Sequence, residues 1–339
     1  MLKETREKFS GLLARQAELN NVSLSAVENG AKFTVEPAVA QKLEERVREE
    51  SNFLQRINIV PVDQMKGEKV GIGVGSTIAG RTDTDNADRP TQSLVALDKR
   101  GYEVVQTNYD THLTYHLLDT WRHRPDFQPH YTKAVNKQIA RDRLMIGWNG
   151  TSVADTTDRR ANPLLQDVNV GWIQDLKDNR SDAIMTGMKV GKGGDYNNLD
   201  ALVFDVTEEL IAEWHRDNPD MVVICGRKLL SDKYLAMINE YEAPRDKNAL
   251  DIIISNKQIG GLPAVRVPFF PANGLMVTTL DNLSIYVQNG TTRRAIIDNA
   301  KRDRIEDFRS VNEDYVIEDY EAACYVEGIL LPDGNGGWA

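Results

Sequence analysis

Residues 65–117 constrain the fold of this chain more than any other stretch, because they are extended and partly amphipathic but cannot close a core of their own. Over residues 69–74, valine and isoleucine alternate with glycine, and a longer alternation runs over residues 105–117, as in half-buried strands. Residues 76–100 between them are rich in turn-forming Gly, Asp, Asn and Pro. Because an isolated two-stranded ribbon is marginal in water, we expect a protruding ribbon that docks on another surface, such as that of another subunit.

The composition is that of a soluble globular protein with room for two modest domains or one large one. The chain has 339 residues, of which 41% are hydrophobic, and its net charge of -10 argues against a nucleic-acid-binding domain. No run approaches the roughly eighteen apolar residues that cross a bilayer, and the start MLKETREKFSG lacks the apolar core of a signal peptide, so we expect residence in the cytoplasm. Cys225 and Cys324 lie in apolar segments and are predicted to be buried free thiols.

The first part of the chain is predicted to be an arm. Residues 2–20 have the apolar spacing of an amphipathic helix, the next ten are rich in Asn, Ser and Gly like a linker, and a charged helix with Pro37 in its first turn covers residues 36–54. A helix on a tether is either a removable or partner-bound segment or a helix packed on the main domain. The residues leave both alternatives open.

The remainder predicts a long helix followed by mixed structure. Residues 126–148 carry the longest helical pattern, with Lys133, Lys137 and Arg141 facing outward. After a loop-rich zone, residues 199–271 alternate helix, strand, helix and strand, which indicates a compact α/β subdomain. The segments beyond residue 274 are strand-like and imply an antiparallel return sheet.

Several motifs resemble sites but fail on their surroundings. GSTIAGRT at residues 75–82 matches a phosphate-binding loop except for Arg81, and the turn-forming DTDNADRPTQ follows where a helix should begin. The aspartates after it do not fit a calcium loop, and His112 and His116 would lie roughly 13 Å apart on a strand, too far for one zinc ion. We therefore predict no catalytic, cofactor-binding or metal-binding residues and no cofactor. The charged residues 298–315 are predicted to form a solvated or intersubunit face.

Long, uncommon strings follow one another in the order seen in one protein family. They are KFTVEP, FLQRINIVPV, MKGEKVGIGV, NPLLQDVNVGW, VGKGGDYNNLDALVFD, GRKLLSDKY, LPAVRVPFFP, NLSIYVQ and NEDYVIEDYEAAC. Over nearly its whole length, the chain resembles the P-two-like family of tailed-phage major capsid proteins.

The resemblance implies an α+β fold, the tailed-phage major capsid fold, and a division of the chain. The expected parts are an N-terminal assembly segment (1–33) removed on maturation, an N-terminal arm (34–64), an extended two-stranded loop (65–117), a peripheral domain (118–198) with a spine helix (126–148), an axial α/β domain (199–271), and return strands of the peripheral domain with a C-terminal tail (272–339).

The resemblance also implies a structural protein and not an enzyme: a subunit of hexamers and pentamers in an icosahedral head that encloses double-stranded DNA without reading its sequence. Its expected partners are further copies of itself, a scaffolding protein with protease activity and a portal protein, with no membrane; the expected location is the virion capsid, assembled in the host bacterial cytoplasm. The maturation cleavage is expected among Gly30, Ala31, Lys32, Phe33 and Thr34. Loop contacts between subunits are expected from Lys66, Lys69, Arg81, Asp83, Asp85 and Arg89.

One further expectation concerns assembly, and two alternative functions remain. No clear lysine and asparagine pair for covalent crosslinking stands out, so assembly is predicted to be noncovalent. An encapsulin-like nanocompartment that packages an enzyme is the first alternative. A nucleotide-binding protein that uses the glycine-rich loop is the second.

Overall fold

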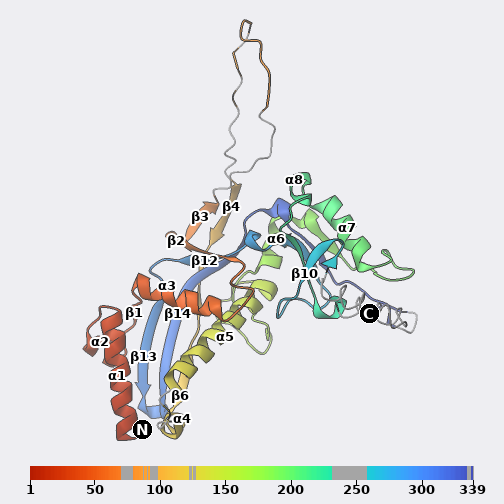
Figure 1. The fold of residues 1–339 in the computed structure, drawn as a ribbon. Coiled ribbons are helices and arrows are strands. Elements are labelled where there is room, and N and C mark those ends of the chain that lie inside the picture. Colours follow the sequence, from red (N-terminus) through yellow and green to blue (C-terminus); the bar gives the residue numbers. More distant parts are fainter. Residues whose placement is uncertain are drawn as a thin grey trace, which may run out of the picture.

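Two β-sheets form the body of the chain, and a two-stranded ribbon extends from it (Figure 1). The computed structural model describes residues 1–69, 79–86, 88–89, 91, 98–121, 124, 127–230, 258–333 and 337–338. Several predicted segments lie outside the described residues. These are most of the strand over residues 69–74, much of the glycine-rich loop and, within residues 199–271, most of the second helix and all of the second strand. The mixture of helices and sheets agrees with the predicted α+β class.

The first sheet is long and is built around one strand, β14 (Arg304–Ile317). β14 pairs antiparallel with β12 (Leu283–Gln288), β13 (Arg293–Asn299), β5 (Val105–Asn108) and β6 (Thr111–Thr114). β1 (Phe33–Thr34) extends the sheet beyond β13, and β2 (Asn58–Val62) pairs in parallel with β12.

Two predictions about this region are wrong in part. The alternation over residues 105–117 is real, since Thr107 and Tyr109 are buried between exposed neighbours, but these residues pair with β14 and do not form the returning strand of the ribbon. α4 (Tyr115–Trp121) begins where the strand was expected to continue. Most of residues 298–315 are not a solvated face either, because their charged side chains alternate with buried ones along β14, and Asp307 and Glu313 are themselves buried.

The ribbon has its own two-stranded pairing at the root. β3 (Lys66–Lys69) pairs antiparallel with β4 (Asp98–Glu103), with a register shift after Glu68. The returning strand therefore ends at Glu103, and the chain enters the first sheet at Val105.

The second sheet follows the order β7–β15–β11–β8–β10–β9. Its strands are β7 (Ile184–Thr186), β8 (Met221–Cys225), β9 (Gln258–Ile259), β10 (Leu262–Val265), β11 (Leu275–Thr279) and β15 (Cys324–Glu327). Every residue of β8 and β11 is buried, which explains their continuous apolar runs. α7 (Leu199–Leu210) packs its apolar face in the same cluster, and α8 (Glu213–Arg216) follows it.

The strands beyond residue 274 do not form one return sheet. β12, β13 and β14 belong to the first sheet, whereas β11 and β15 pair in the second sheet, beside β8. The prediction of a single antiparallel return is wrong here because alternate residues of β11 and β15 pack into two different hydrophobic clusters, one on each face of the second sheet.

One long helix packs in the main hydrophobic core together with residues of both sheets. α5 (Phe127–Asn149) agrees with the predicted helix, and Lys133, Lys137 and Arg141 are exposed on it as expected. Its end packs Trp148 against Trp172 of α6 (Trp172–Asn179), with Phe53 and Phe270 in the same aromatic cluster. Short 3-10 helices lie at Ser181–Ala183, Leu280–Asn282, Ala300–Arg302 and Tyr320–Ala322. None of the described helices is long and apolar enough to cross a membrane.

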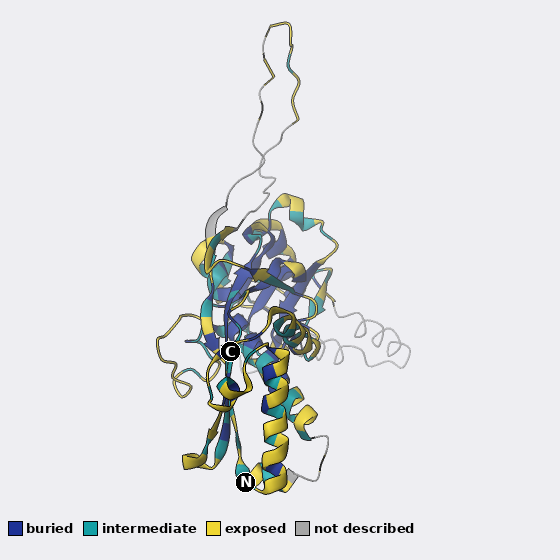
Figure 2. Cartoon of the chain, turned by 90° about the vertical axis from the view of Figure 1, so that its left-hand side faces the viewer, coloured by how far each residue is buried: buried dark blue, intermediate teal, exposed yellow. Residues whose placement is uncertain are grey.

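The N-terminal helices pack on the first sheet at β13 and β14. α1 (Lys3–Leu19) and α2 (Leu24–Glu28) precede β1, and α3 (Pro37–Glu49) follows it (Figure 1). Figure 2 shows the exposed outer face of α1. The first helix is packed on the rest of the chain, and its removal on maturation stays a prediction. The stretch expected to be a linker holds α2, which starts where the Ser23 hydroxyl accepts a hydrogen bond from the Ala26 amide (3.3 Å).

Candidate functional site

The root of the ribbon is held on the first sheet by an aromatic contact and a hydrogen bond. The Tyr102 ring meets the Tyr286 ring edge-on at a centroid distance of 4.9 Å, and the Glu103 amide donates to Asp314 Oδ2 (2.9 Å). Across the ribbon, Gly67 lies so close to Tyr102 that a Cβ at residue 67 would fall 2.6 Å from the tyrosine hydroxyl. The ribbon therefore leaves the body in one defined direction at its root.

Lys66 and Lys69 lie in this root, among the residues predicted to contact another subunit. Lys66 Nζ is 2.6 Å from Glu103 Oε1 of the opposite strand, and both side chains are more than half exposed. Lys66 thus has an ionic partner within its own ribbon, and an exposed pair of this kind contributes only about 0–1 kcal/mol. Lys69 is the last residue of β3.

The tip of the ribbon brings together the other predicted contact residues. Asp83 closes a turn, since its Oδ1 accepts from the Asp85 amide (3.1 Å) and its Oδ2 accepts from the Asn86 side chain (2.8 Å). Arg81, Asp85 and Arg89 are exposed and form no ion pair with any described residue. The tip therefore presents charges of both signs, while Asp83 serves the turn itself.

The predicted cleavage region consists of an exposed step between two structured parts. Gly30 ends the turn after α2 with φ of 72°, a backbone conformation that favours glycine. Ala31 and Lys32 are exposed and belong to no helix or strand. Phe33 and Thr34 form β1, opposite Arg294 and Arg293, and Phe33 is buried. Among the five residues, only the Ala31–Lys32 step is both exposed and free of regular structure.

A buried ionic cluster joins the arm, the long helix and the central strand. Arg143 of α5 donates from Nη1 and Nη2 to Glu44 of α3 (2.6 and 2.9 Å) and from Nε to Glu313 of β14 (3.0 Å). The Tyr109 and Tyr315 hydroxyls also donate to Glu313. Burial opposes the charge on Arg143, but Glu44 and Glu313 outweigh it and raise the pKa of the guanidinium. Burial and Glu313 together raise the pKa of both tyrosines.

A second ionic cluster links β13 to β14. Asp307 accepts from Arg294 (2.8 and 2.9 Å) and from Arg309 (2.8 Å). Burial alone would raise the pKa of Asp307, but the two guanidinium groups outweigh it and lower the pKa to about 2. Arg294 also donates to Gln16 of α1 (2.8 Å), so this cluster reaches the N-terminal segment.

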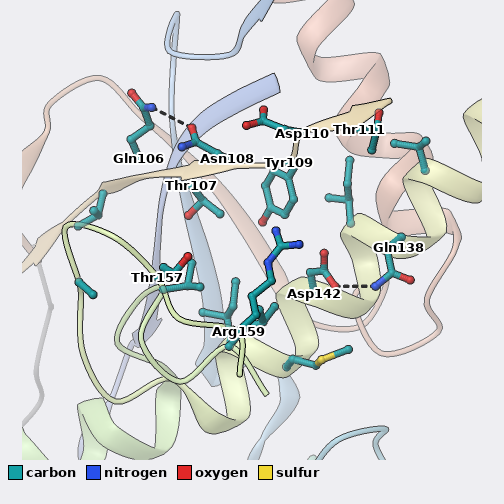
Figure 3. A pocket seen from close by; sticks show the side chains of 18 of the residues that line it. Gln106, Thr107, Asn108, Tyr109, Asp110, Thr111, Gln138, Asp142, Thr157 and Arg159 are labelled. Carbon is teal, nitrogen blue, oxygen red and sulfur yellow. Dashed lines mark hydrogen bonds between the residues drawn. The ribbon is translucent and has the colours of Figure 1, made fainter. Parts of the chain in front are cut away.

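A groove of about 960 Å³ lies between β5, β6, α5 and the loop around residues 153–168. Figure 3 shows the Arg159 side chain extending into it between Tyr109 and Asp142. Burial raises the pKa of Asp142, whose carboxylate accepts from Gln138 (2.7 Å), and the buried Thr107 hydroxyl has no partner.

The described residues include no group of three or more His, Cys, Asp or Glu arranged to hold a metal ion. His112 lies on β6 and His116 on α4. Cys225 and Cys324 are buried free thiols, as predicted, and burial raises the pKa of Cys324 to about 12. Such a thiol is a poor nucleophile.

Both ionic clusters escaped prediction from the sequence. Glu44, Arg143 and Glu313 are far apart in the chain, and each is next to another charged residue that is not buried. The one available signal was the strand period, which places Asp307 on the same face as Ile305, and Glu313 on the same face as Val311 and Tyr315.

Comparison with known proteins gives consistent results along the whole chain. The sequence profile of the family described as "Phage major capsid protein, P2 family" matches residues 8–329. The chain is 46% identical to a protein described as "Capsid proteins" of Escherichia phage P2, over 98% of this chain and 96% of that one. It is 36% identical to the major capsid protein of Serratia phage KSP20, over 98% and 99% of the two chains.

Solved structures agree with these sequence relatives. One such structure is the satellite phage P4 procapsid, which includes the size determination (Sid) protein. One of its chains superposes on this chain with a TM-score of 0.81 and 45% identity, over 98% of this chain and 99% of that one. The capsid chain of an empty GTA particle matches with a TM-score of 0.52 at 12% identity, over 82% and 89%, which is a likeness of fold alone.

Proposed function

The chain belongs to the P2 family of phage major capsid proteins, and on that premise we propose that its copies assemble into hexamers and pentamers of an icosahedral head around double-stranded DNA. The observation that carries this proposal is the likeness, from end to end, to a procapsid subunit. The family is a structural one, and the buried Arg143 cluster, which links α3, α5 and β14 within one subunit, suits a shell protein. The net charge of -10 fits a container that encloses DNA without binding it tightly.

We propose that the ribbon contacts an adjacent subunit through its tip. Arg81, Asp85 and Arg89 support this role because they are exposed and have no ionic partner among the described residues. Lys66 and Asp83 already have partners within the ribbon, and they and Lys69 stay proposed contacts. In the proposed division, β8, β9 and β10 of the second sheet fall in the axial domain (199–271), and we propose that β7, β11 and β15, which complete that sheet, belong to it too.

We also propose that a scaffolding protein with protease activity directs assembly in the host cytoplasm, that a portal protein joins the shell, and that residues up to the Gly30–Thr34 region are then removed. Within this region we favour cleavage of the Ala31–Lys32 bond, because both residues are exposed and a protease needs an accessible, extended backbone. The P4 procapsid, which includes a size determination protein, supports the involvement of a second protein in assembly.

Electron microscopy of the subunit produced together with its scaffolding protein tests the proposal. We expect closed shells of uniform size, and double-stranded DNA in particles from infected cells. Particles that hold a cargo enzyme and no DNA would instead support a nanocompartment. The intact mass of subunits from mature particles should correspond to a chain that begins near residue 32. A mass that includes Met1 or Leu2 would contradict cleavage. We expect one subunit band on denaturing gels, and a ladder would contradict noncovalent assembly.

A further inference from the structure

Residues 1–31 bind the rest of the chain through a small apolar interface of their own. Leu13 and Ala17 of α1 and Val27 of α2 are at most 5% exposed. They pack in one cluster with Phe33, Val35, Ile296 and Ile305, which belong to the arm and to β13 and β14. The N-terminal segment therefore covers an apolar face of the first sheet.

Polar contacts fasten the segment at its first residues, the end farthest in sequence from the proposed cleavage. Asp119 of α4 accepts from the Leu2 amide (3.1 Å) and from the Thr5 hydroxyl (2.8 Å), and the N-terminal ammonium lies 4.0 Å from it. In the middle, Gln16 accepts from Arg294 (2.8 Å). Asn20, after the end of α1, accepts from the Glu36 amide (3.1 Å).

None of these contacts depends on the peptide bond between Ala31 and Lys32. β1 holds Phe33 and Thr34 to β13 after that bond, and the turn at Gly30, packed on Ile297, precedes it. A cut at the exposed step would leave every anchor of the segment in place on both sides.

We propose that residues 1–31 remain docked on β13, β14 and α4 after cleavage, and that their release is a separate step controlled by the apolar anchor Leu13 and the Thr5–Asp119 contact. This inference rests on the proposed cleavage. While the segment stays bound, it closes the apolar face formed by Phe33, Val35, Ile296 and Ile305 to any other subunit. Release opens a contiguous apolar surface, which favours new contacts between copies.

The test uses the full chain with a protease recognition sequence inserted between Ala31 and Lys32. After complete cutting, the protein is diluted. Native mass spectrometry then measures, over time, the fraction of chains beginning at residue 32 that still carry the fragment of residues 1–31. Leu13→Ala removes a buried side chain, and Leu19→Ala is the matched control, because Leu19 lies on the same helix and is 43% exposed. Thr5→Val removes the hydroxyl that donates to Asp119 and leaves Asp119 itself unchanged.

We expect the unsubstituted fragment to stay bound after the cut, and Leu13→Ala to release it at least tenfold faster. Thr5→Val should release it about fivefold faster, and Leu19→Ala at the unsubstituted rate. Thermal unfolding of the uncut variants verifies that their bodies are intact. Loss of the unsubstituted fragment within the dead time, or equal rates for Leu13→Ala and Leu19→Ala, would overturn the proposal. Because the cut is engineered, this result is independent of whether natural subunits are cleaved, which intact mass decides.

Discussion

Arg143 of α5 and Glu313 of β14 form an ion pair with both side chains buried: Nη2 and Oε2 lie 3.0 Å apart, and the side chains are 1% and 0% exposed. Glu44 of the arm is the second carboxylate on the same guanidinium and is 24% exposed. One cation thus holds two carboxylates from two other elements, so the three positions are not equivalent.

Arg143→Met should destabilise the subunit most, by roughly 3–5 kcal/mol, because it leaves two carboxylates close together without a cation and one of them fully buried. Urea denaturation of the unassembled subunit measures the free energy of unfolding. Arg141→Met is the control, since Arg141 is exposed on the same helix, and should change this free energy by about 0.5 kcal/mol or less.

Glu44→Gln should be the mildest change in this cluster, because Arg143 keeps Glu313 as its counterion and Glu44 is partly in water. We expect a loss of about 1 kcal/mol, within the range of hydrogen bonds to charged groups. If Glu44→Gln proved as damaging as Arg143→Met in the same urea titration, the Arg143–Glu313 pair could not be self-sufficient.

Acid should weaken the link between β13 and β14 through Asp307. The pKa of this carboxyl is about 2 in the fold against an ordinary value of 3.8, so the folded state favours the charged form. Its contribution is complete above the unfolded pKa and is lost as pH falls from about 4 to about 2. The lost stability is on the order of 2 kcal/mol.

Denaturation between pH 5 and pH 2 measures this contribution. Asp307→Asn should lower stability at pH 5 and flatten the decline toward pH 2 relative to the unsubstituted chain. An equally steep decline in both proteins would assign the acid sensitivity to other carboxylates.

Gly147→Ala should destabilise the core of α5, although alanine is the better helix former. A Cβ at residue 147 would lie 2.3 Å from Cζ3 of Trp172, whose ring is held in the aromatic cluster. We expect a loss of about 1–3 kcal/mol from overpacking, read from the urea midpoint. Gly11→Ala is the matched helical control: nothing lies within 4 Å of its Cβ, and it should stabilise α1 by up to about 1 kcal/mol.

Reversing the charges of the ribbon tip should impair assembly but not folding. The double variant with Arg81→Glu and Arg89→Glu changes only exposed side chains without a described ionic partner, so unfolding of the single subunit should not shift. The yield of closed shells, counted in micrographs, should fall at least tenfold. Lys137→Glu, on an exposed side chain of α5, serves as the charge-reversal control and should assemble normally.

Deleting residues 75–90 is the stronger form of the same test. The deletion removes the tip and leaves β3 and β4 at the root, so we expect a soluble, folded subunit that forms no closed shells. Shells of normal yield and size from the deletion would refute a role for the tip in assembly.

Local pattern was enough to predict several elements and the family. The long helix over residues 126–148 appears as Phe127–Asn149 because its apolar residues repeat with the helical period, and the alternation at Thr107 and Tyr109 marks a real strand. The buried thiols followed from their apolar surroundings. The family followed from long strings in a fixed order, which no single motif could replace.

Strand partners and ion pairs lay beyond the reach of the sequence. The period of residues 105–114 states which side chains share a face, but not that the neighbour is β14 instead of β3. Likewise, β11 and β15 read as strands like β12, yet they pair in the other sheet.

By itself, the sequence determined the family, the long helix and the strand character of residues 105–114, because these depend on spacing and order along the chain. Only the tertiary structure decided that the ribbon returns at Glu103, that residues 1–31 pack on the first sheet, and that Arg143 holds Glu44 and Glu313. Each of these depends on residues distant in sequence meeting in space, and a charge becomes an anchor only where burial removes the water that would otherwise solvate it.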